Sequence, residues 1–411
     1  MTLATYSKVT QESHTKPRIT VLGSTGSIGA NTLDVLSRNA DLFEVYALCA
    51  ATQVDLMVEQ CVAFSPRFAV MADAQAGAHL QARLQALALP TRVRIGETAM
   101  CEVSAAPDVD MVMGAIVGAA GLAPCLAAAH AGKRLLLANK EALVVGGDLF
   151  MQAVRGGGAT LLPIDSEHSA IFQALPEDAT TWDRRVEKII LTASGGPFRT
   201  RDPSTLRDVT PAQAVAHPNW VMGKKISVDS ATMMNKALEI IEAHHLFRMA
   251  PERLDVVIHP QSVVHSMVQF NDRSVVAQLG TPDMRVPIAY GLSWPERINS
   301  GALPMDFAAM ANLTFELPSR SRFPGLFLAW DALRGPLGSS AVLNAANEIA
   351  VEAFLNERIR FDQIVSVNQA VLEMPQDIQG NSFEALMAID ALTRVRAEAL
   401  VAQWSKGSGI C

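Results

Sequence analysis

Two carboxylates standing two residues apart are the first candidates for metal binding in this chain. Asp165 and Glu167 follow an apolar run over residues 161–164, which we expect to be a strand. In an extended chain the side chains at i and i+2 point the same way, so both carboxylates would converge at the strand end. Such oxygen ligands suit a hard divalent ion, Mg²⁺ or Mn²⁺. The pair alone is weak support, since an acidic loop is the more common explanation.

A second group of polar residues lies in residues 227–239, which have the pattern of a loop entering a helix. Asn235, Lys236 and Glu239 are spaced i, i+1 and i+4, so they crowd one end and one face of that helix. Asn235 and Lys236, with Ser230 upstream, could hold a phosphate, while Glu239 offers a third carboxylate to the metal. The alternative is an exposed helix with incidental polar residues.

Three further segments have the composition of ligand-binding loops. TASGGPF at residues 192–198 places two glycines beside Ser194, so its backbone N–H groups would be exposed. Lys140 follows a buried strand and would stand at the carboxyl edge of a sheet, where open α/β folds bind ligands. HPNWVMG at residues 217–223 resembles a mobile lid, because Pro and Gly interrupt any helix there. An ordinary loop with Trp220 in the core explains it equally well.

A glycine-rich turn near the N-terminus has the pattern of a dinucleotide-binding site. The strand expected at residues 18–22 leads into GSTGSIG at residues 23–29, and a helix follows from about Asn31. The glycines would let the chain turn tightly and approach a pyrophosphate, which would contact free N–H groups at the helix N-terminus. The spacing G-x-x-G-x-x-G is a variant of the commoner fingerprint, and a glycine turn without ligand is the alternative.

The residues after the second expected strand bear on which dinucleotide is bound. An NAD enzyme usually places a carboxylate there to accept hydrogen bonds from the ribose. This chain has Ala51, Thr52 and Gln53 instead, so nothing there would repel a 2′-phosphate. The sequence therefore favours NADP over NAD, although no Arg or Lys stands there to bind the phosphate.

The elements that must position these residues predict an α/β fold class. Short apolar runs alternating with amphipathic stretches indicate an N-terminal Rossmann-like, doubly wound parallel sheet, followed by a central α+β catalytic domain and a C-terminal α-helical bundle. The expected strands are residues 18–22, 45–49, 68–70, 111–113, 134–138, 188–192, 255–259, 262–270 and 274–279. The expected helices include residues 231–247, 326–334, 341–356, 361–374 and 383–404.

These patterns divide the chain into five parts. We expect a disordered N-terminal tail at residues 1–17, an NADPH-binding Rossmann-like domain at 18–163 and a catalytic domain with the metal, substrate and flap at 164–291. A proline-punctuated linker would follow at 292–323, and a C-terminal helical bundle at 324–411.

Length and composition exclude several classes of protein. A chain of 411 residues is long enough for two or three domains, and 49% hydrophobic residues provide real cores. The 34 basic and 41 acidic residues, with no basic block, argue against a nucleic-acid partner. The uncharged run 111–129 approaches membrane-spanning length, but its glycines and Pro124 indicate a strand, a turn and a helix instead. Five scattered cysteines favour a reducing compartment and disfavour structural zinc.

Taken together, the motifs resemble the 1-deoxy-D-xylulose 5-phosphate reductoisomerase family over essentially the whole chain after Pro17. They occur in the family's order: GSTGSIG, LANKEA, PIDSEHSA, SGGPF, HPNW-x-MG-x-K, SVDSATMMNKALE and LNAANE. The resemblance implies rearrangement and reduction of 1-deoxy-D-xylulose 5-phosphate to 2-C-methyl-D-erythritol 4-phosphate, in the non-mevalonate (MEP) pathway of isoprenoid biosynthesis. It also implies NADPH, a divalent metal (Mg²⁺, Mn²⁺ or Co²⁺), a homodimer and a bacterial cytoplasmic location, with no nucleic-acid or membrane partner.

The resemblance also implies roles for particular residues. NADPH would be contacted by Thr25, Gly26, Ser27, Ile28, Asn139, Glu141 and Gly223, and by the segment Ala51, Thr52 and Gln53. The metal would be held by Asp165, Glu167 and Glu239. The substrate would be bound by Lys140, Ser166, Glu167, Ser194, His217, Ser230, Asn235, Lys236 and Glu239, with Ser194, Ser230, Asn235 and Lys236 around its phosphate. Catalysis would use Lys140, Asp165, Glu167, His217 and Glu239, and a flap would contain Trp220 and Met222.

One departure from the family is visible, and two other functions compete. Where the family often has Gly-Lys-Asn after the second strand, this chain has Ala51-Thr52-Gln53, which weakens the assignment of the 2′-phosphate contact. A metal-independent NADP-dependent aldehyde or homoserine-type dehydrogenase would explain the glycine turn but leave the three carboxylates without a role. A non-catalytic sugar-phosphate sensor would explain the phosphate pocket but need neither nicotinamide nor metal.

Overall fold

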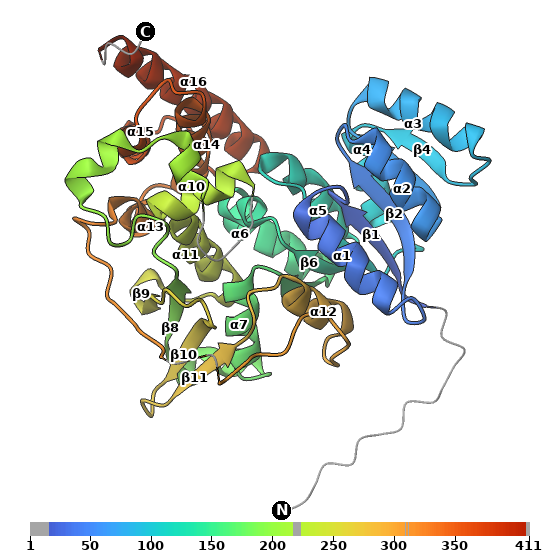
Figure 1. Ribbon diagram of the computed structural model, residues 1–411, viewed down its shortest axis with the longest axis horizontal. Coiled ribbons are helices and arrows are strands. Elements are labelled where there is room, and N and C mark those ends of the chain that lie inside the picture. Colours follow the sequence, from blue (N-terminus) through green and yellow to red (C-terminus); the bar gives the residue numbers. More distant parts are fainter. Residues whose placement is uncertain (1–15, 217–222, 309, 311, 408–411) are drawn as a thin grey trace, which may run out of the picture.

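The computed structural model describes residues 16–216, 223–308, 310 and 312–407 (Figure 1). Residues 1–15 of the expected disordered tail lie outside the described residues. The described part has a parallel sheet near the N-terminus, a smaller mixed sheet, and a group of helices formed by the C-terminal quarter of the chain. This arrangement confirms the predicted fold class.

The first sheet has seven parallel strands in the order β4-β3-β2-β1-β5-β6-β7. The order reverses beside β1, so the carboxyl ends of β1 and β5 flank the crevice where such folds bind ligands. The strands are β1 (Arg18–Leu22), β2 (Glu44–Ala50), β3 (Phe68–Met71), β4 (Arg92–Ile95), β5 (Met111–Gly114), β6 (Arg134–Leu137) and β7 (Thr160–Pro163). Sequence analysis missed β4, because this edge strand alternates arginines with apolar residues and lacks a buried run.

Helices cover both faces of this sheet. They are α1 (Ser27–Arg38), α2 (Val54–Phe64), α3 (Ala74–Ala86), α4 (Glu97–Ala105), α5 (Leu122–His130) and α6 (Lys140–Gly157). Neighbouring strand residues enter different cores: Val21 packs with Leu33 and Leu48, whereas Leu22 packs with Val112 and Leu135. Burial on both faces explains the continuous apolar strands. The uncharged run forms β5, a short turn and α5, and no helix in the described part of the chain is long and apolar enough to span a membrane.

The second sheet has the order β11-β10-β8-β9, and only the β8/β9 pair within it is parallel. Its strands are β8 (Val186–Ala193), β9 (Leu254–Ile258), β10 (Val264–Phe270) and β11 (Val275–Leu279). The helices of this region include α7 (Ser166–Ala174), α8 (Trp182–Arg185), α9 (Pro211–Ala214), α10 (Lys224–Thr232) and α11 (Met234–Phe247). Helix α11 buries Leu238 and Ile241 in a core shared with Ile189 and Leu191 of β8.

The prediction of a loop at residues 227–230 is wrong, because these residues are helical. Helix α10 runs over them, and Met233 then takes a left-handed conformation (φ 62°) that separates α10 from α11. Two hydroxyl groups of this segment form hydrogen bonds with backbone carbonyls of the helix or of its N-cap. The Ser227 hydroxyl donates to the Gly223 carbonyl at 3.1 Å, and the Thr232 hydroxyl donates to the Val228 carbonyl at 3.1 Å.

Two later segments pack back on the earlier parts of the fold. Helix α12 (Arg285–Ser293) spans the end of the expected catalytic segment and the start of the expected linker, yet it shares a core with the first sheet through Ile288 and Leu292. The C-terminal helices are α13 (Pro324–Arg334), α14 (Ser339–Leu355), α15 (Phe361–Leu372) and α16 (Phe383–Gly407). Among these, α14 contacts both α6 and α10, so the helical group packs beside these two helices (Figure 1).

Candidate active site

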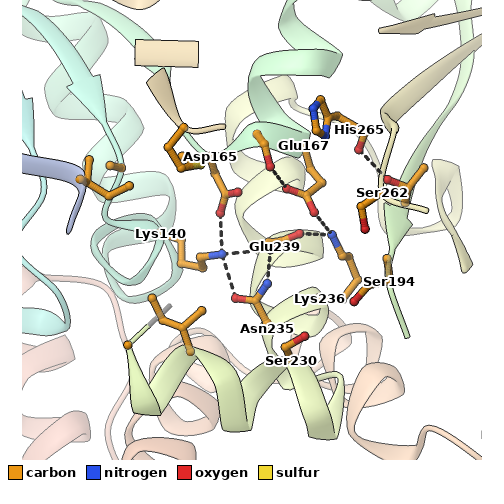
Figure 2. A pocket seen from close by; sticks show the side chains of 18 of the residues that line it. Lys140, Asp165, Glu167, Ser194, Ser230, Asn235, Lys236, Glu239, Ser262 and His265 are labelled. Atoms are coloured by element: carbon orange, nitrogen blue, oxygen red, sulfur yellow. Dashed lines mark hydrogen bonds and ion pairs between the residues drawn. The ribbon is translucent and has the colours of Figure 1, made fainter. Parts of the chain in front are cut away.

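One cavity of about 200 Å³ brings together residues from both sheets and from the helices between them. Its walls include the N-terminus of α1, the end of β6 with the start of α6, the start of α7, the end of β8, and helices α10 and α11. Figure 2 shows the polar side chains of these elements pointing toward one another. The predicted residues that line it are Ser27, Ile28, Lys140, Asp165, Ser166, Glu167, Ser194, Gly223, Ser230, Asn235, Lys236 and Glu239.

Asp165, Glu167 and Glu239 offer carboxylate oxygens that all lie within 4.8 Å of one another. The expectation that Asp165 and Glu167 converge along an extended strand is wrong. The strand ends at Pro163, and α7 begins at Ser166, so Glu167 lies in the first helical turn. Asp165 precedes that helix without capping it through its side chain, which leaves its carboxylate facing the cavity. The third carboxylate comes from α11.

Two lysines neutralise part of this acidic cluster (Figure 2). The Lys140 ammonium lies 2.5 Å from Asp165 Oδ2 and 3.0 Å from Glu239 Oε1, and it donates to Asn235 Oδ1 at 3.0 Å. The Lys236 ammonium donates to Glu167 Oε1 at 2.7 Å and also pairs with Glu239. Three carboxylates therefore share two ammonium groups in a largely buried space.

The pKa values of the carboxyl groups in this cluster bear on whether it could hold a divalent cation. Burial and then the charge of Glu239 raise the pKa of Glu167 to about 7. Burial also opposes ionisation of Asp165, but Lys140, His168 and Lys236 together outweigh it and hold the pKa of Asp165 well below its usual value. The cluster therefore has one carboxyl group that is only partly ionised near pH 7, and added positive charge would favour its ionised form. Three convergent oxygen ligands with this deficit fit a hard divalent ion.

A buried pair that sequence analysis missed lies behind the cluster. His168 Nε2 is 2.8 Å from the Glu239 carbonyl oxygen, and its Nδ1 is 3.3 Å from Glu242 Oε2. Both side chains are almost fully buried, and burial followed by the charge of Asp165 raises the pKa of Glu242 well above its usual value. His168, Glu242 and Asp165 form a second possible ligand group, but neither His168 nor Glu242 lines the cavity.

The opposite wall is formed by hydroxyl and amide side chains. Ser194 accepts a hydrogen bond from the Gly196 N–H at 3.2 Å within the loop after β8. Gly196 has φ +68°, and a Cβ there would stand 2.7 Å from the Ser230 carbonyl oxygen. The loop can therefore approach α10 this closely only with glycine at 196. That approach brings Ser194 and Ser230 to the same cavity.

Several cavity residues were absent from the sequence-based assignment. Ser262 and His265 line the wall beside Ser194. The expected strand over residues 262–270 concealed Ser262, but β10 begins at Val264 and Ser262 has a left-handed backbone (φ 53°). Other missed lining residues are Asn31, Ala138, Thr192, Ala193, Ile226, Met233 and Met284. The polar residues 259–262, between the apolar strands β9 and β10, were the sequence feature that could have indicated a loop containing Ser262.

The glycine turn has the geometry of a phosphate cradle. A Cβ at Gly23 would stand 2.6 Å from the Ala115 carbonyl oxygen, and one at Gly29 would stand 2.3 Å from the Gly23 carbonyl oxygen. Gly26 precedes α1 without a side-chain cap, and the first turn of α1 carries no acidic residue. Its N–H groups therefore remain available to an anion. Uncapped N–H groups in the first turn of α1, beside a turn that excludes Cβ atoms, fit a dinucleotide pyrophosphate.

The remaining predicted cofactor residues lie around this turn and at the start of α6. Ala51, Thr52 and Gln53 are exposed at the end of β2. Asn139 caps α6 by accepting from the Ala142 N–H at 3.0 Å, and Glu141 in its first turn lies 3.1 Å from the Lys225 ammonium. The predicted substrate residue His217 and the predicted flap residues Trp220 and Met222 lie outside the described residues.

Comparisons with known proteins agree over most of the chain. Residues 19–147 match the family model of 1-deoxy-D-xylulose 5-phosphate reductoisomerase, residues 161–247 match that of its C-terminal domain, and residues 279–396 match the DXP reductoisomerase C-terminal domain. The 1-deoxy-D-xylulose 5-phosphate reductoisomerase of Cupriavidus metallidurans is 58% identical over 382 residues, which cover 93% of this chain and 97% of that relative. That of Aromatoleum aromaticum is 57% identical over 390 residues, covering 94% and 97%.

Solved structures show the same similarity. A crystal structure of DOX-P reductoisomerase in complex with NADPH, fosmidomycin and magnesium superposes with a TM-score of 0.90 at 42% identity, covering 94% of this chain and 98% of that one. The 1-deoxy-D-xylulose 5-phosphate reductoisomerase from Zymomonas mobilis in complex with NADPH gives a TM-score of 0.88 at 44% identity, covering 94% and 98%.

Proposed function

The chain belongs to the 1-deoxy-D-xylulose 5-phosphate reductoisomerase family, and we propose from this premise how its own residues carry out the family's reaction. It is an NADP-dependent oxidoreductase that rearranges 1-deoxy-D-xylulose 5-phosphate and reduces the product to 2-C-methyl-D-erythritol 4-phosphate, in the MEP pathway of isoprenoid biosynthesis. The observation that carries the assignment is a single cavity with three carboxylates on one wall and the start of α1 on another.

Asp165, Glu167 and Glu239 are the proposed metal ligands. A bound divalent ion (Mg²⁺, Mn²⁺ or Co²⁺) would polarise the substrate carbonyl and stabilise the negative charge that develops during rearrangement. Support comes from their mutual approach within 4.8 Å and from the raised pKa of Glu167, which burial and then the charge of Glu239 cause. Lys140 bridges Asp165 and Glu239 and would donate a hydrogen bond to a substrate oxygen at that end of the cavity.

The substrate phosphate is proposed to bind at the wall formed by Ser194, Ser230, Asn235 and Lys236. These residues offer two hydroxyl groups, an amide and an ammonium to one anion. Lys236 lies between this wall and the carboxylates, since its ammonium contacts both Glu167 and Glu239. The carbon skeleton would then extend toward Lys140, Ser166, Glu167 and Glu239. His217, Trp220 and Met222 are proposed to complete the substrate site and its flap.

The cofactor is proposed to bind from the glycine turn toward the start of α6. Thr25, Gly26, Ser27 and Ile28 would contact the pyrophosphate, and Asn139, Glu141 and Gly223 would contact the nicotinamide half. NADPH supplies the hydride that reduces the rearranged aldehyde. Ser27, Ile28 and Gly223 all line the cavity, so a dinucleotide on the turn would reach the carboxylate wall. Ala51, Thr52 and Gln53 are proposed to face the 2′-phosphate.

We also propose a homodimer and a cytoplasmic location in a bacterium. Of the described strands, β10 is the one that pairs with β11, so β11 is an edge of the second sheet. Val275, Val276 and Leu279 of this edge are 47%, 44% and 38% exposed. An exposed apolar edge strand is a surface that natural proteins usually cover. A second copy of this chain is the proposed covering partner.

The test of the function is an assay of NADPH consumption with 1-deoxy-D-xylulose 5-phosphate, run with Mg²⁺ and with a chelator. We expect turnover with the metal and its loss on chelation. Turnover that survives chelation would favour a metal-independent dehydrogenase instead. Binding of the sugar phosphate without any NADPH consumption would favour a sensor.

A further inference from the structure

The C-terminal motif LNAANE has no role in the site described above, yet one of its residues is connected to that site by buried polar contacts. Asn347 lies on α14 and is fully buried. Its side-chain amide donates to Asp229 Oδ1 of α10 at 2.7 Å, and its oxygen accepts from Asn368 of α15 at 2.9 Å. Buried amide groups in proteins are usually hydrogen-bonded, as this one is. The two hydrogen bonds of Asn347 connect helices α10, α14 and α15.

Lys225 continues this chain of contacts to the first turn of α6. Its ammonium lies 2.8 Å from Asp229 Oδ2 and 3.1 Å from Glu141 Oε1. The side chains of Asp229 and Glu141 are only 1% and 7% exposed, while that of Lys225 is 23% exposed. Each carboxylate would be costly to bury without this ammonium.

Lys225 ties together two elements that form walls of the cavity. Glu141 is adjacent in sequence to Lys140, whose ammonium bridges Asp165 and Glu239. Asp229 is adjacent to Ser230, which lines the opposite wall together with Ile226. The distance between the start of α6 and α10 therefore depends on an ion pair that lies outside the cavity lining.

We propose that Lys225 is a positioning residue that fixes the first turn of α6 against α10. Asp229 holds the Lys225 ammonium from the same helix, and Asn347 supports Asp229 from the C-terminal helix α14. This inference rests on the proposed function, because the cavity walls that it concerns are those assigned to the substrate and NADPH. The LNAANE motif thereby acts on the active site without touching a ligand.

The same contacts predict how the loss of the Asn347 side-chain amide would change the position of Lys225. Replacing Asn347 by Leu removes the donor to Asp229 Oδ1 while keeping a side chain of similar size. Lys225 would then be drawn toward the less satisfied Asp229 carboxylate and away from Glu141. The first turn of α6 would lose its tie to α10, although every proposed ligand contact remains in the chain.

The test uses the full-length enzyme with Asn347→Leu, Lys225→Gln and the double variant. Turnover with 1-deoxy-D-xylulose 5-phosphate gives KM and kcat, and fluorescence titration of the substrate-free protein gives the Kd for NADPH. We expect Asn347→Leu to raise both KM and Kd by about tenfold while kcat changes less than about threefold. Because the residues act through one chain of contacts, the double variant should match Lys225→Gln alone.

Asn39→Leu is the matched control. Asn39 is also buried and donates through its amide at 2.8 Å to the Val35 carbonyl and at 3.0 Å to the Asn299 carbonyl, but it lies at the end of α1 away from the glycine turn. This variant should lose thermal stability with unchanged KM and Kd.

Two results would overturn the proposal. One is an Asn347→Leu enzyme that loses stability like the control while its KM and Kd stay within about twofold of wild type. The other is a double variant whose effects multiply, which would show that Lys225 and Asn347 act independently. If the Lys225→Gln variant does not fold, the comparison of KM and Kd between Asn347→Leu and Asn39→Leu decides the proposal by itself. A wild-type enzyme without turnover on this substrate would refute the proposed function instead, and the NADPH titration would still test the positioning role.

Discussion

Glu239 is the residue on which both halves of the cavity depend. It contacts Lys140 from α6 and Lys236 from its own helix, and it is 1% exposed. Its helix also carries Asn235, which belongs to the proposed phosphate wall. Removal of its charge would therefore disturb the proposed metal ligands without altering the glycine turn on the far side.

We expect Glu239→Gln to lower kcat by orders of magnitude and to leave the Kd for NADPH nearly unchanged, because the amide cannot replace the carboxylate as a ligand for a hard ion. Steady-state turnover with saturating Mg²⁺ and a fluorescence titration of NADPH give the two numbers. Wild-type turnover in this variant would contradict the metal assignment.

Glu167 gives the cavity a dependence on pH. Burial and then the charge of Glu239 raise its pKa to about 7, above the ordinary value of 4.5. The folded, metal-free protein therefore holds a proton that the unfolded chain has already lost between these pH values. This contribution favours folding at low pH, and it diminishes as pH rises from about 4.5 to about 7.

The same shift predicts that Mg²⁺ binds more tightly as pH rises through about 7, with release of a proton on binding. Calorimetric titration of Mg²⁺ in two buffers of different ionisation enthalpy measures both quantities. Glu167→Gln should remove the proton release. Affinity for Mg²⁺ that is independent of pH across this range would show that Glu167 is already ionised in the metal-free enzyme.

Thr52 tests the cofactor preference. No acidic residue stands among the exposed residues 51–53, so NADPH should outperform NADH in kcat/KM. Thr52→Asp should narrow this difference by repelling the 2′-phosphate, whereas Thr52→Ser should leave it nearly unchanged. Parallel kinetics with both cofactors make the comparison. Equal use of NADPH and NADH by the wild-type enzyme would refute the preference.

At the scale of elements, close backbone approaches place the walls of the cavity. The loop after β8 meets α10 where Gly196, at φ +68°, leaves room for the Ser230 carbonyl oxygen. Helices α10 and α11 are separated by the single left-handed residue Met233, so they present Ser230 and Asn235 from two directions. These junctions decide how the two serines and the amide meet.

We therefore expect Gly196→Ala to destabilise the protein by about 1 to 3 kcal/mol and to raise KM for the substrate, because the added Cβ strains the backbone and pushes the loop from α10. Gly156→Ala is the control: it lies in α6, nothing stands within 4 Å of its added Cβ, and it should stabilise by about 0.5 to 1 kcal/mol. Chemical denaturation and KM measurements separate them. Equal stability of the two variants would show that the loop accommodates a Cβ.

At the scale of the whole molecule, the exposed edge of the second sheet predicts self-association. Val276→Lys places a charge on β11, where the valine is 44% exposed. We expect light scattering to show a dimer for the wild-type protein and a shift toward monomer for this variant, with the fold retained. A control at Val395, which is 67% exposed on α16, should leave the dimer intact when changed to Lys. A wild-type monomer would refute the proposed homodimer.

Much of the fold follows from local sequence patterns. The strand Arg18–Leu22 and the glycine turn are readable because burial on both faces of a parallel sheet requires continuous apolar runs, and because a tight turn against the neighbouring backbone excludes Cβ atoms. The C-terminal helices could also be predicted, because their apolar residues recur at helical spacing. The starts of α7 and α10 were predicted wrongly, because polar residues near the start of a helix are equally common in loops.

The site itself was decided by tertiary structure. Nothing local shows that Lys140 meets Asp165 and Glu239, since these residues belong to different elements and only packing of α6, α7 and α11 brings them together. The His168–Glu242 pair and the contact from Asn347 to Asp229 were equally invisible in the sequence. Periodicity reports which face of an element is buried, but not which element will cover that face. That choice depends on the packing of whole helices and sheets, and it determines which polar groups share one buried space.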